Sequence, residues 1–119
     1  MLTSQQTGAV VELLKKRTDL EGVYVFGSHA SGRATATSDV DLGVLCGRLL
    51  DPMAKVQLKS ALADALHCDV DLVMLHDASP IVGMQVLKNG VLIANVKPRQ
   101  VAEFTMRTIT DYADLKRVR

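Results

Sequence analysis

The stretch VYVFGSHASGRATATSDVDLGVL, residues 23–45, decides the fold of this chain. It opens with Val23–Phe26, a β-branched and aromatic run typical of a strand. Gly27-Ser28 ends that run, and ten small, polar or basic residues follow. A second, mostly apolar run then extends over Asp39–Cys46. The stretch therefore predicts two strands joined by a polar loop.

Two aspartates in the second predicted strand call for an explanation. Asp39 and Asp41 are separated by one residue, and residues two apart on a strand project to the same side. A buried carboxylate is costly unless a cation or a hydrogen-bond donor meets it. The pattern therefore predicts a cation at this face of the sheet.

The rest of the chain alternates between helical and strand patterns. Thr3 and Gln6 have the spacing of a capping box, while Asp51-Pro52 and Ser79-Pro80 each place an N-cap residue before a proline. These signals predict the following further elements: helices from Thr3, from Asp51-Pro52 to about Leu66, from Ser79-Pro80 to Asn89-Gly90 and from Pro98, and strands over Asp69–Leu75 and Val91–Val96. We expect one α/β (α+β) domain over residues 1–119, a mixed four-stranded sheet with helices packed on it.

Several core positions follow from the same patterns. The first strand is expected to begin after Gly22, which interrupts the preceding helical pattern. Helical spacing predicts these core residues: Val10, Leu13 and Leu14 in the first helix, Val56, Ala63 and Leu66 in the second, and Val101, Phe104, Ile109 and Tyr112 in the last.

The predicted topology adds a third carboxylate. A helix joins the second and third strands, so these strands should be parallel. Asp71 of the third strand could then lie beside Asp41. Three carboxylates on one face repel one another unless divalent cations neutralise them. Mg²⁺ prefers carboxylates, water and substrate phosphates, and two such ions can clamp both oxygens of an in-line phosphoryl displacement.

The loop between the first two strands suits an anionic ligand. Gly27 allows a sharp turn and close approach of the backbone, and Ser28 offers a hydroxyl and a backbone N–H group to phosphate. Arg33 adds a positive charge. His29 is expected to be a solvent-facing loop residue, and His67 and His76 to be surface or edge residues. A triphosphate with bound Mg²⁺ would explain the carboxylates and the loop together.

The composition argues against a nucleic-acid-binding protein and against a membrane protein. A net charge of +1, 3% aromatic residues and no tryptophan disfavour a nucleic-acid-binding protein. No apolar run approaches the roughly 20 residues of a membrane span, so no membrane association is expected. Cys46 and Cys68 lack metal-ligand spacing and both fall in apolar surroundings. We therefore expect two buried, reduced thiols in a cytoplasmic protein.

The combination of Gly27-Ser28, ten residues, Asp39-x-Asp41 and a later Asp71 resembles the signature of the DNA-polymerase-β-type nucleotidyltransferases. The small size and the stretch VLKNGVLIANV resemble its minimal members, the MNT antitoxins of HEPN/MNT toxin–antitoxin pairs. The resemblance implies that Gly27 and Ser28 hold the triphosphate, that Asp39 and Asp41 bind Mg²⁺, and that Asp71 is a third metal-binding and catalytic carboxylate. Family members often carry an arginine at the position of Ser31, and here Arg33 follows two residues later.

The resemblance also implies an activity and a partner. It implies transfer of AMP from ATP to a hydroxyl, on a tyrosine, of a cognate HEPN toxin. Two alternatives remain open. The chain could neutralise the toxin by binding alone, through the last helix and the basic residues Lys116, Arg117 and Arg119, or it could modify a small molecule as a homodimer.

Overall fold

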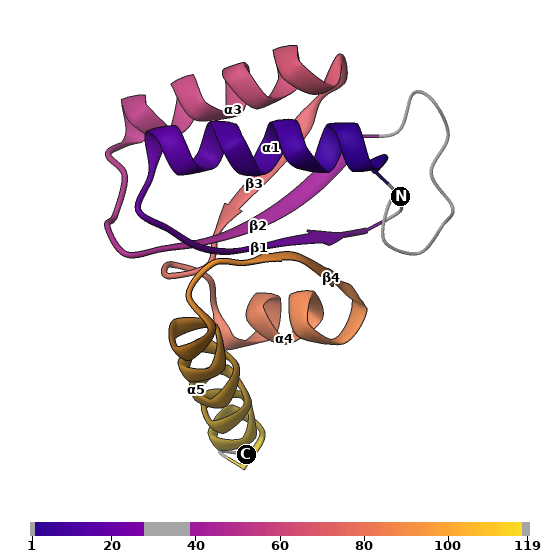
Figure 1. Cartoon of the computed structure of the whole chain (residues 1–119). Coiled ribbons are helices and arrows are strands. Elements are labelled where there is room, and N and C mark those ends of the chain that lie inside the picture. The colour runs from indigo at the N-terminus through magenta and orange to yellow at the C-terminus, as the bar shows by residue number, and fades with distance from the viewer. Residues whose placement is uncertain (1, 28–38, 118–119) are drawn as a thin grey trace.

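A four-stranded sheet forms the centre of the molecule (Figure 1). The computed structural model describes residues 2–27 and 39–117. The strand order is β3-β2-β1-β4, and the strands are β1 (Leu20–Phe26), β2 (Val40–Cys46), β3 (Val70–Met74) and β4 (Val91–Asn95). β1 runs antiparallel to both β2 and β4, whereas β2 and β3 are parallel. The predicted mixed sheet and the parallel pair are both confirmed.

Helices cover the two faces of this sheet. The described residues form the helices α1 (Ser4–Arg17), α3 (Pro52–Leu66), α4 (Pro80–Asn89) and α5 (Pro98–Arg117). α1 and α3 lie side by side on one face, while α4 and α5 lie on the other (Figure 1). The C-terminal part of α5 extends away from the sheet (Figure 1).

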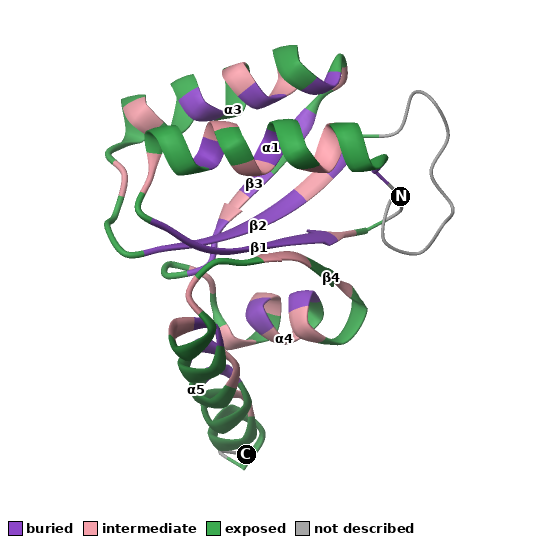
Figure 2. Ribbon diagram, in the orientation of Figure 1, coloured by how far each residue is buried: buried purple, intermediate pink, exposed green. Residues whose placement is uncertain are grey.

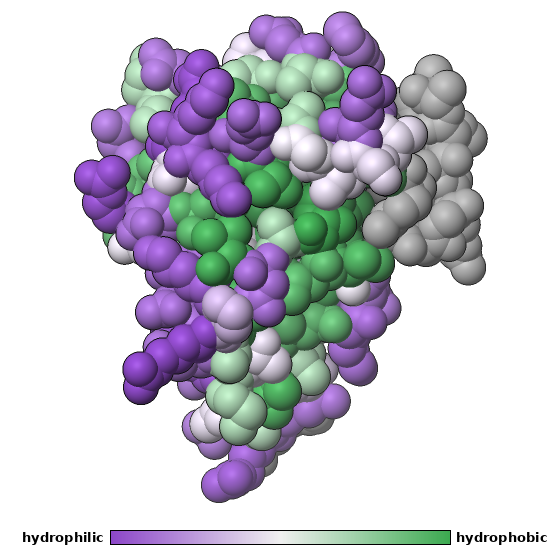
Figure 3. All heavy atoms as spheres, viewed as in Figure 1, coloured by the Kyte–Doolittle hydropathy of each residue, from purple (hydrophilic) through white to green (hydrophobic). Residues whose placement is uncertain are grey.

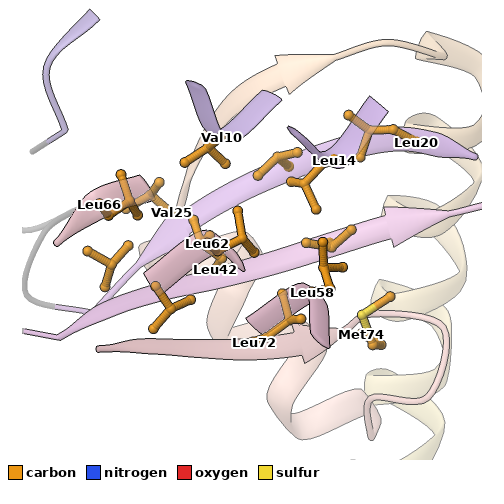
Figure 4. Packing of buried hydrophobic residues seen from close by; sticks show 14 of the residues in the cluster. Val10, Leu14, Leu20, Val25, Leu42, Leu58, Leu62, Leu66, Leu72 and Met74 are labelled. Atoms are coloured by element: carbon orange, nitrogen blue, oxygen red, sulfur yellow. The ribbon is translucent and has the colours of Figure 1, made fainter. Parts of the chain in front are cut away.

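Each face of the sheet has its own hydrophobic core. On the α1/α3 face, apolar side chains from both helices and from β1, β2 and β3 point toward one another (Figure 4). On the α4/α5 face, a smaller cluster contains Tyr24, Leu45, Leu75, Val86, Val101 and Phe104. Burial on both faces explains why the central strands are nearly continuous apolar runs rather than alternating ones (Figure 2).

The helix starts follow the predicted caps. Thr3 accepts the backbone N–H of Gln6, and the Gln6 side chain accepts the N–H of Thr3, which completes the capping box. Asp51 caps α3 and Ser79 caps α4, each followed by a proline. These side chains satisfy N–H groups that have no partner within the helix.

The Thr3 cap gives a first testable prediction. Replacing Thr3 with alanine removes the hydroxyl that accepts the Gln6 N–H, so the free energy of unfolding should fall by about 1 kcal/mol. Thr110→Ala is the matched control, because Thr110 is an exposed residue inside α5 and alanine has the higher helix propensity. Urea denaturation of both variants measures the difference, and equal stability of the two would contradict the role of the cap.

Three details of the sequence-based prediction were wrong. β1 begins at Leu20, and Gly22 lies inside it, paired with Leu45 of β2 and Asn95 of β4. A glycine suits this position because a Cβ would lie 2.9 Å from Val101 Cγ2. Val56 is 62% exposed and Ile109 is 43% exposed. In both helices the packed face is displaced from these positions. Leu58 is buried in α3, and Thr108 is buried in α5, where it lies against Gly83 of α4.

Apolar residues also appear on the surface. In Figure 3, hydrophobic residues gather in the middle of the face shown, at the level of β1 and β4. Val91 and Leu92 of the edge strand β4 are exposed, as is Val96 just after it. None of the helices that the structure describes is long and apolar enough to cross a bilayer.

Candidate active site

The sheet register brings two of the predicted carboxylates together. Asp41 of β2 is the direct neighbour of Asp71 of β3 in the parallel pairing. On its other side, Asp41 is paired with Phe26, the last residue of β1. Neighbouring strands are about 4.8 Å apart, so the predicted juxtaposition of Asp41 and Asp71 is confirmed.

Both aspartates lie on the α4/α5 face of the sheet. Leu45, four residues after Asp41 on β2, belongs to the core on that face, and Val73, two residues after Asp71 on β3, packs against it. Positions two or four apart on a strand face the same side. Val40, Leu42 and Leu72 point to the opposite face, into the α1/α3 core. The alternation therefore holds the carboxylates on one side while the flanking apolar side chains anchor both strands from the other.

The carboxylates differ in their exposure. Asp41 is half-buried and Asp71 is exposed. Asp39 is exposed and lies directly before the first residue of β2. Like charges at neighbouring strand positions destabilise a sheet. A cation bound between Asp41 and Asp71 would therefore reduce the repulsion between these two carboxylates.

Gly27 makes room for one of these carboxylates. Its φ is +71°, the left-handed region that L-residues with side chains rarely adopt. A Cβ built on Gly27 would collide with Oδ2 of Asp41 and would lie 3.1 Å from its Cγ. The sequence suggested a turn and a phosphate contact at Gly27, but nothing in it indicated that this glycine also leaves space for Asp41.

The chemistry of this donor set suits a hard divalent cation, since Mg²⁺ takes carboxylate oxygens together with water and phosphate. Within residues 2–27 and 39–117, however, no three His, Cys, Asp or Glu side chains are grouped closely enough to hold a metal ion. The structure thus brings Asp41 and Asp71 together and leaves Asp39 at the adjoining strand end. Ser28, His29 and Arg33 lie outside the described residues.

Comparison with known proteins assigns the family. Residues 9–99 match the family described as polymerase beta, nucleotidyltransferase. The chain belongs to this family. The protein adenylyltransferase MntA of Shewanella oneidensis is 34% identical over 108 residues, which cover 90% of this chain and 77% of the relative.

Solved structures of the family have the same architecture. One is a toxin–antitoxin with AMP-PNP, with a TM-score of 0.85 and 33% identity, over 92% of this chain and 89% of the other. Another is a tri-AMPylated Shewanella oneidensis HEPN toxin in complex with an MNT antitoxin, with a TM-score of 0.80 and 31% identity, over 93% and 87% of the two chains. The resemblance to a polymerase-β-type, MNT-like fold is confirmed.

Burial and nearby carboxylates raise the pKa values of the two cysteine thiols, Cys46 and Cys68. Burial raises the pKa of the Cys68 thiol, and the nearby charges of Asp39 and Asp69 raise it further. Burial also raises the pKa of Cys46, whose Sγ donates to the carbonyl of Arg48. At pH 7 both residues should therefore be protonated and react slowly with thiol reagents.

This electrostatic arrangement gives a second prediction. Asp39→Asn removes a negative charge that disfavours the Cys68 thiolate, so the pKa of Cys68 should fall and its alkylation at pH 8 should become a few-fold faster. The rate can be followed by mass spectrometry with iodoacetamide. Asp64→Asn, an exposed position on α3, should leave the rate unchanged. An unchanged rate in Asp39→Asn would show that this charge does not act on Cys68.

Proposed function

We propose that this protein transfers AMP from ATP to a hydroxyl group, on a tyrosine, of a cognate HEPN-domain toxin and thereby acts as its antitoxin. The observation that carries the proposal is the register of Asp41 against Asp71 on one sheet face, in a chain 34% identical to a protein adenylyltransferase. We further propose that residues 1–119 form one minimal catalytic domain that works in the cytoplasm, where ATP is available.

In this proposal Asp39 and Asp41 hold Mg²⁺ with Asp71 as a third carboxylate. Bound Mg²⁺, as two ions with nucleotide present, would neutralise charge on the phosphates and polarise the α-phosphate. Asp71 accepts the proton of the attacking hydroxyl. The hydroxyl oxygen forms a bond to the α-phosphorus, the bond between that phosphorus and the α–β bridging oxygen breaks, and pyrophosphate leaves with the electron pair.

The loop after β1 would hold the other end of the nucleotide. Gly27, at positive φ, turns the chain at the end of β1 beside Asp41. Ser28 and Arg33 follow it in the sequence, and we propose that they contact the triphosphate through a hydroxyl, backbone N–H groups and a guanidinium.

A protein acceptor suits the surface of the molecule. Exposed apolar residues occur on the edge strand β4, at Val91 and Leu92, and on α5, at Met106 and Ile109. Val91 and Leu92 are adjacent in sequence, and neighbouring exposed apolar residues are available for contact with a protein partner. The solved relatives include a complex with a HEPN toxin that carries AMP groups, which supports a toxin as the acceptor here.

The test is intact-mass spectrometry of a cognate HEPN-domain protein after incubation with this chain, ATP and Mg²⁺. A gain of one or more AMP units is expected. A stable complex without any mass gain would favour an antitoxin that acts by binding. AMP transfer to a small molecule but not to the protein would favour the small-molecule enzyme.

A further inference from the structure

Glu21 is a buried carboxylate at the end of β1 away from the proposed active site. The residue is 8% exposed. Leu20 pairs with Cys46 and Gly22 pairs with Leu45, so Glu21 is the extra residue of a bulge between β1 and β2. Bulges redirect a side chain and are frequent beside functional sites.

The main chain and the side chain of Glu21 are satisfied very differently. Its carbonyl oxygen accepts the backbone N–H groups of Val96 and Lys97, both at 3.0 Å. Within the part of the chain that the structure describes, its carboxylate receives no hydrogen bond. Its ion-pair partner there is His76, whose Nε2 lies 3.8 Å from Oε1. The hydrogen bond to Asp19 raises the pKa of Lys97, and the charge of Glu21 also raises it. A buried carboxylate in this state is costly and requires an explanation.

This carboxylate lines a cavity between the sheet and α5. The cavity has a volume of about 150 Å³, well above the roughly 10–15 Å³ that is needed to hold one water molecule. Its lining residues are Glu21, Leu45, His76, Gln100, Glu103, Phe104 and Arg107. Only Leu45 and Phe104 among them are apolar, so the lining combines a small apolar surface with several convergent polar groups, and polar groups of this kind fix and select a ligand.

The charges of the lining point to one ligand class. Glu21 and Glu103 supply carboxylate acceptors, and Gln100 supplies an amide. Arg107 lines the cavity without an ion pair to any carboxylate of the described residues, and Glu103 pairs with Arg99 at 3.9 Å. The buried, unbonded acceptor is therefore Glu21, and it would be satisfied by a group that carries both positive charge and N–H donors.

We propose that this cavity binds a guanidinium or ammonium group through the carboxylate of Glu21. The site is separate from the proposed nucleotide site, because Glu21 lies at the opposite end of β1 from Phe26, the residue that pairs with Asp41. The group comes either from a basic side chain of a bound protein or from a free small cation. In both cases the recognising chemistry is the same.

The experiment is a titration followed by ¹H–¹⁵N NMR of the full chain at pH 8. The probe is N-acetyl-arginine methylamide, and the citrulline analogue is its uncharged counterpart. Saturable shifts are expected at the amides of Leu45, His76 and Phe104 with the arginine probe and not with the citrulline probe. Methylguanidinium and a Gly-Gly-Arg-Gly-Gly peptide separate the two sources, since tighter binding of the peptide indicates a side chain and equal binding indicates a free cation.

Three variants test the assignment. Glu21→Gln should abolish the saturable shifts, whereas Glu12→Gln, an exposed acid on α1, should retain them. Arg107→Gln removes a like charge from the lining and should tighten binding. The melting temperature of Glu21→Gln should be equal to or above that of the wild type, because the change removes a buried charge without a hydrogen bond.

Two results would overturn the proposal. Shifts that persist in Glu21→Gln, or that occur equally with the citrulline probe, would show that the carboxylate does not recognise the cation. A marked loss of thermal stability in Glu21→Gln, together with no binding by the wild type, would show that Glu21 serves the fold through His76 alone.

Discussion

Replacing Asp39 and Asp41 together with asparagine is expected to lower AMP transfer by about 10³-fold or more. The change removes the charge of two of the three carboxylates proposed to hold Mg²⁺, and metal ions contribute several kcal/mol of transition-state stabilisation, where 1.36 kcal/mol corresponds to a factor of ten. Asparagine keeps a similar shape and an acceptor oxygen, so the fold should remain. Incorporation of AMP into the partner protein measures the rate, and circular dichroism checks the fold.

The control for this double variant is Asp64→Asn, an exposed aspartate on α3. It should transfer AMP at the wild-type rate. If the double variant kept the wild-type rate, the proposed catalytic role of these aspartates would be wrong. If it lost transfer but still neutralised the toxin in cells, occlusion would account for the antitoxin effect and the AMP transfer would be secondary.

Gly27→Ala should reduce both activity and stability. The residue has a φ of +71°, and a Cβ there collides with the Asp41 carboxylate. The left-handed conformation costs a residue with a side chain about 1–2 kcal/mol. Displacement of Asp41 should also lower the rate of transfer by about 10²-fold, the effect of moving a catalytic group by about 1 Å.

A second glycine supplies the control for this change. Gly8 lies within α1, and a Cβ built on it meets no atom within 4 Å. Gly8→Ala should therefore stabilise the protein by about 0.5–1 kcal/mol and leave AMP transfer unchanged. Chemical denaturation and initial rates of both variants give the comparison. Equal behaviour of the two variants would mean that neither the backbone conformation of Gly27 nor its contact with Asp41 matters.

Local signals in the sequence were enough to predict most of the helices and strands and the pairing of two strands. The caps at Thr3, Asp51 and Ser79 depend on a side chain and an N–H group a few residues away, so their positions can be predicted without tertiary information. The parallel pairing of β2 and β3 also followed, because a helix joins them. The sequence also predicted that Asp39, Asp41 and Asp71 form one site, and of these the structure brings Asp41 and Asp71 together.

Tertiary packing decided the rest. Gly22 looks like a breaker, yet it is a strand residue that pairs with Leu45 and Asn95. Val101, distant in sequence, packs where its side chain would be. Val56 has an apolar side chain, but the orientation of α3 on the sheet buries Leu58, Leu62 and Leu66 instead. These outcomes depend on how whole elements pack, which helical periodicity alone does not specify.

The same distinction between sequence and tertiary structure applies to the residues of the proposed sites. The sequence by itself determined the family signature and the three carboxylates, because strand periodicity and residue spacing are local properties. Only the tertiary structure decided that Asp41 is the direct neighbour of Asp71 and that Gly27 leaves space for Asp41. It also decided that Glu21, at a bulge in β1, lines the cavity beside α5. Register, close contact and burial are relations between segments distant in the chain, and folding establishes them.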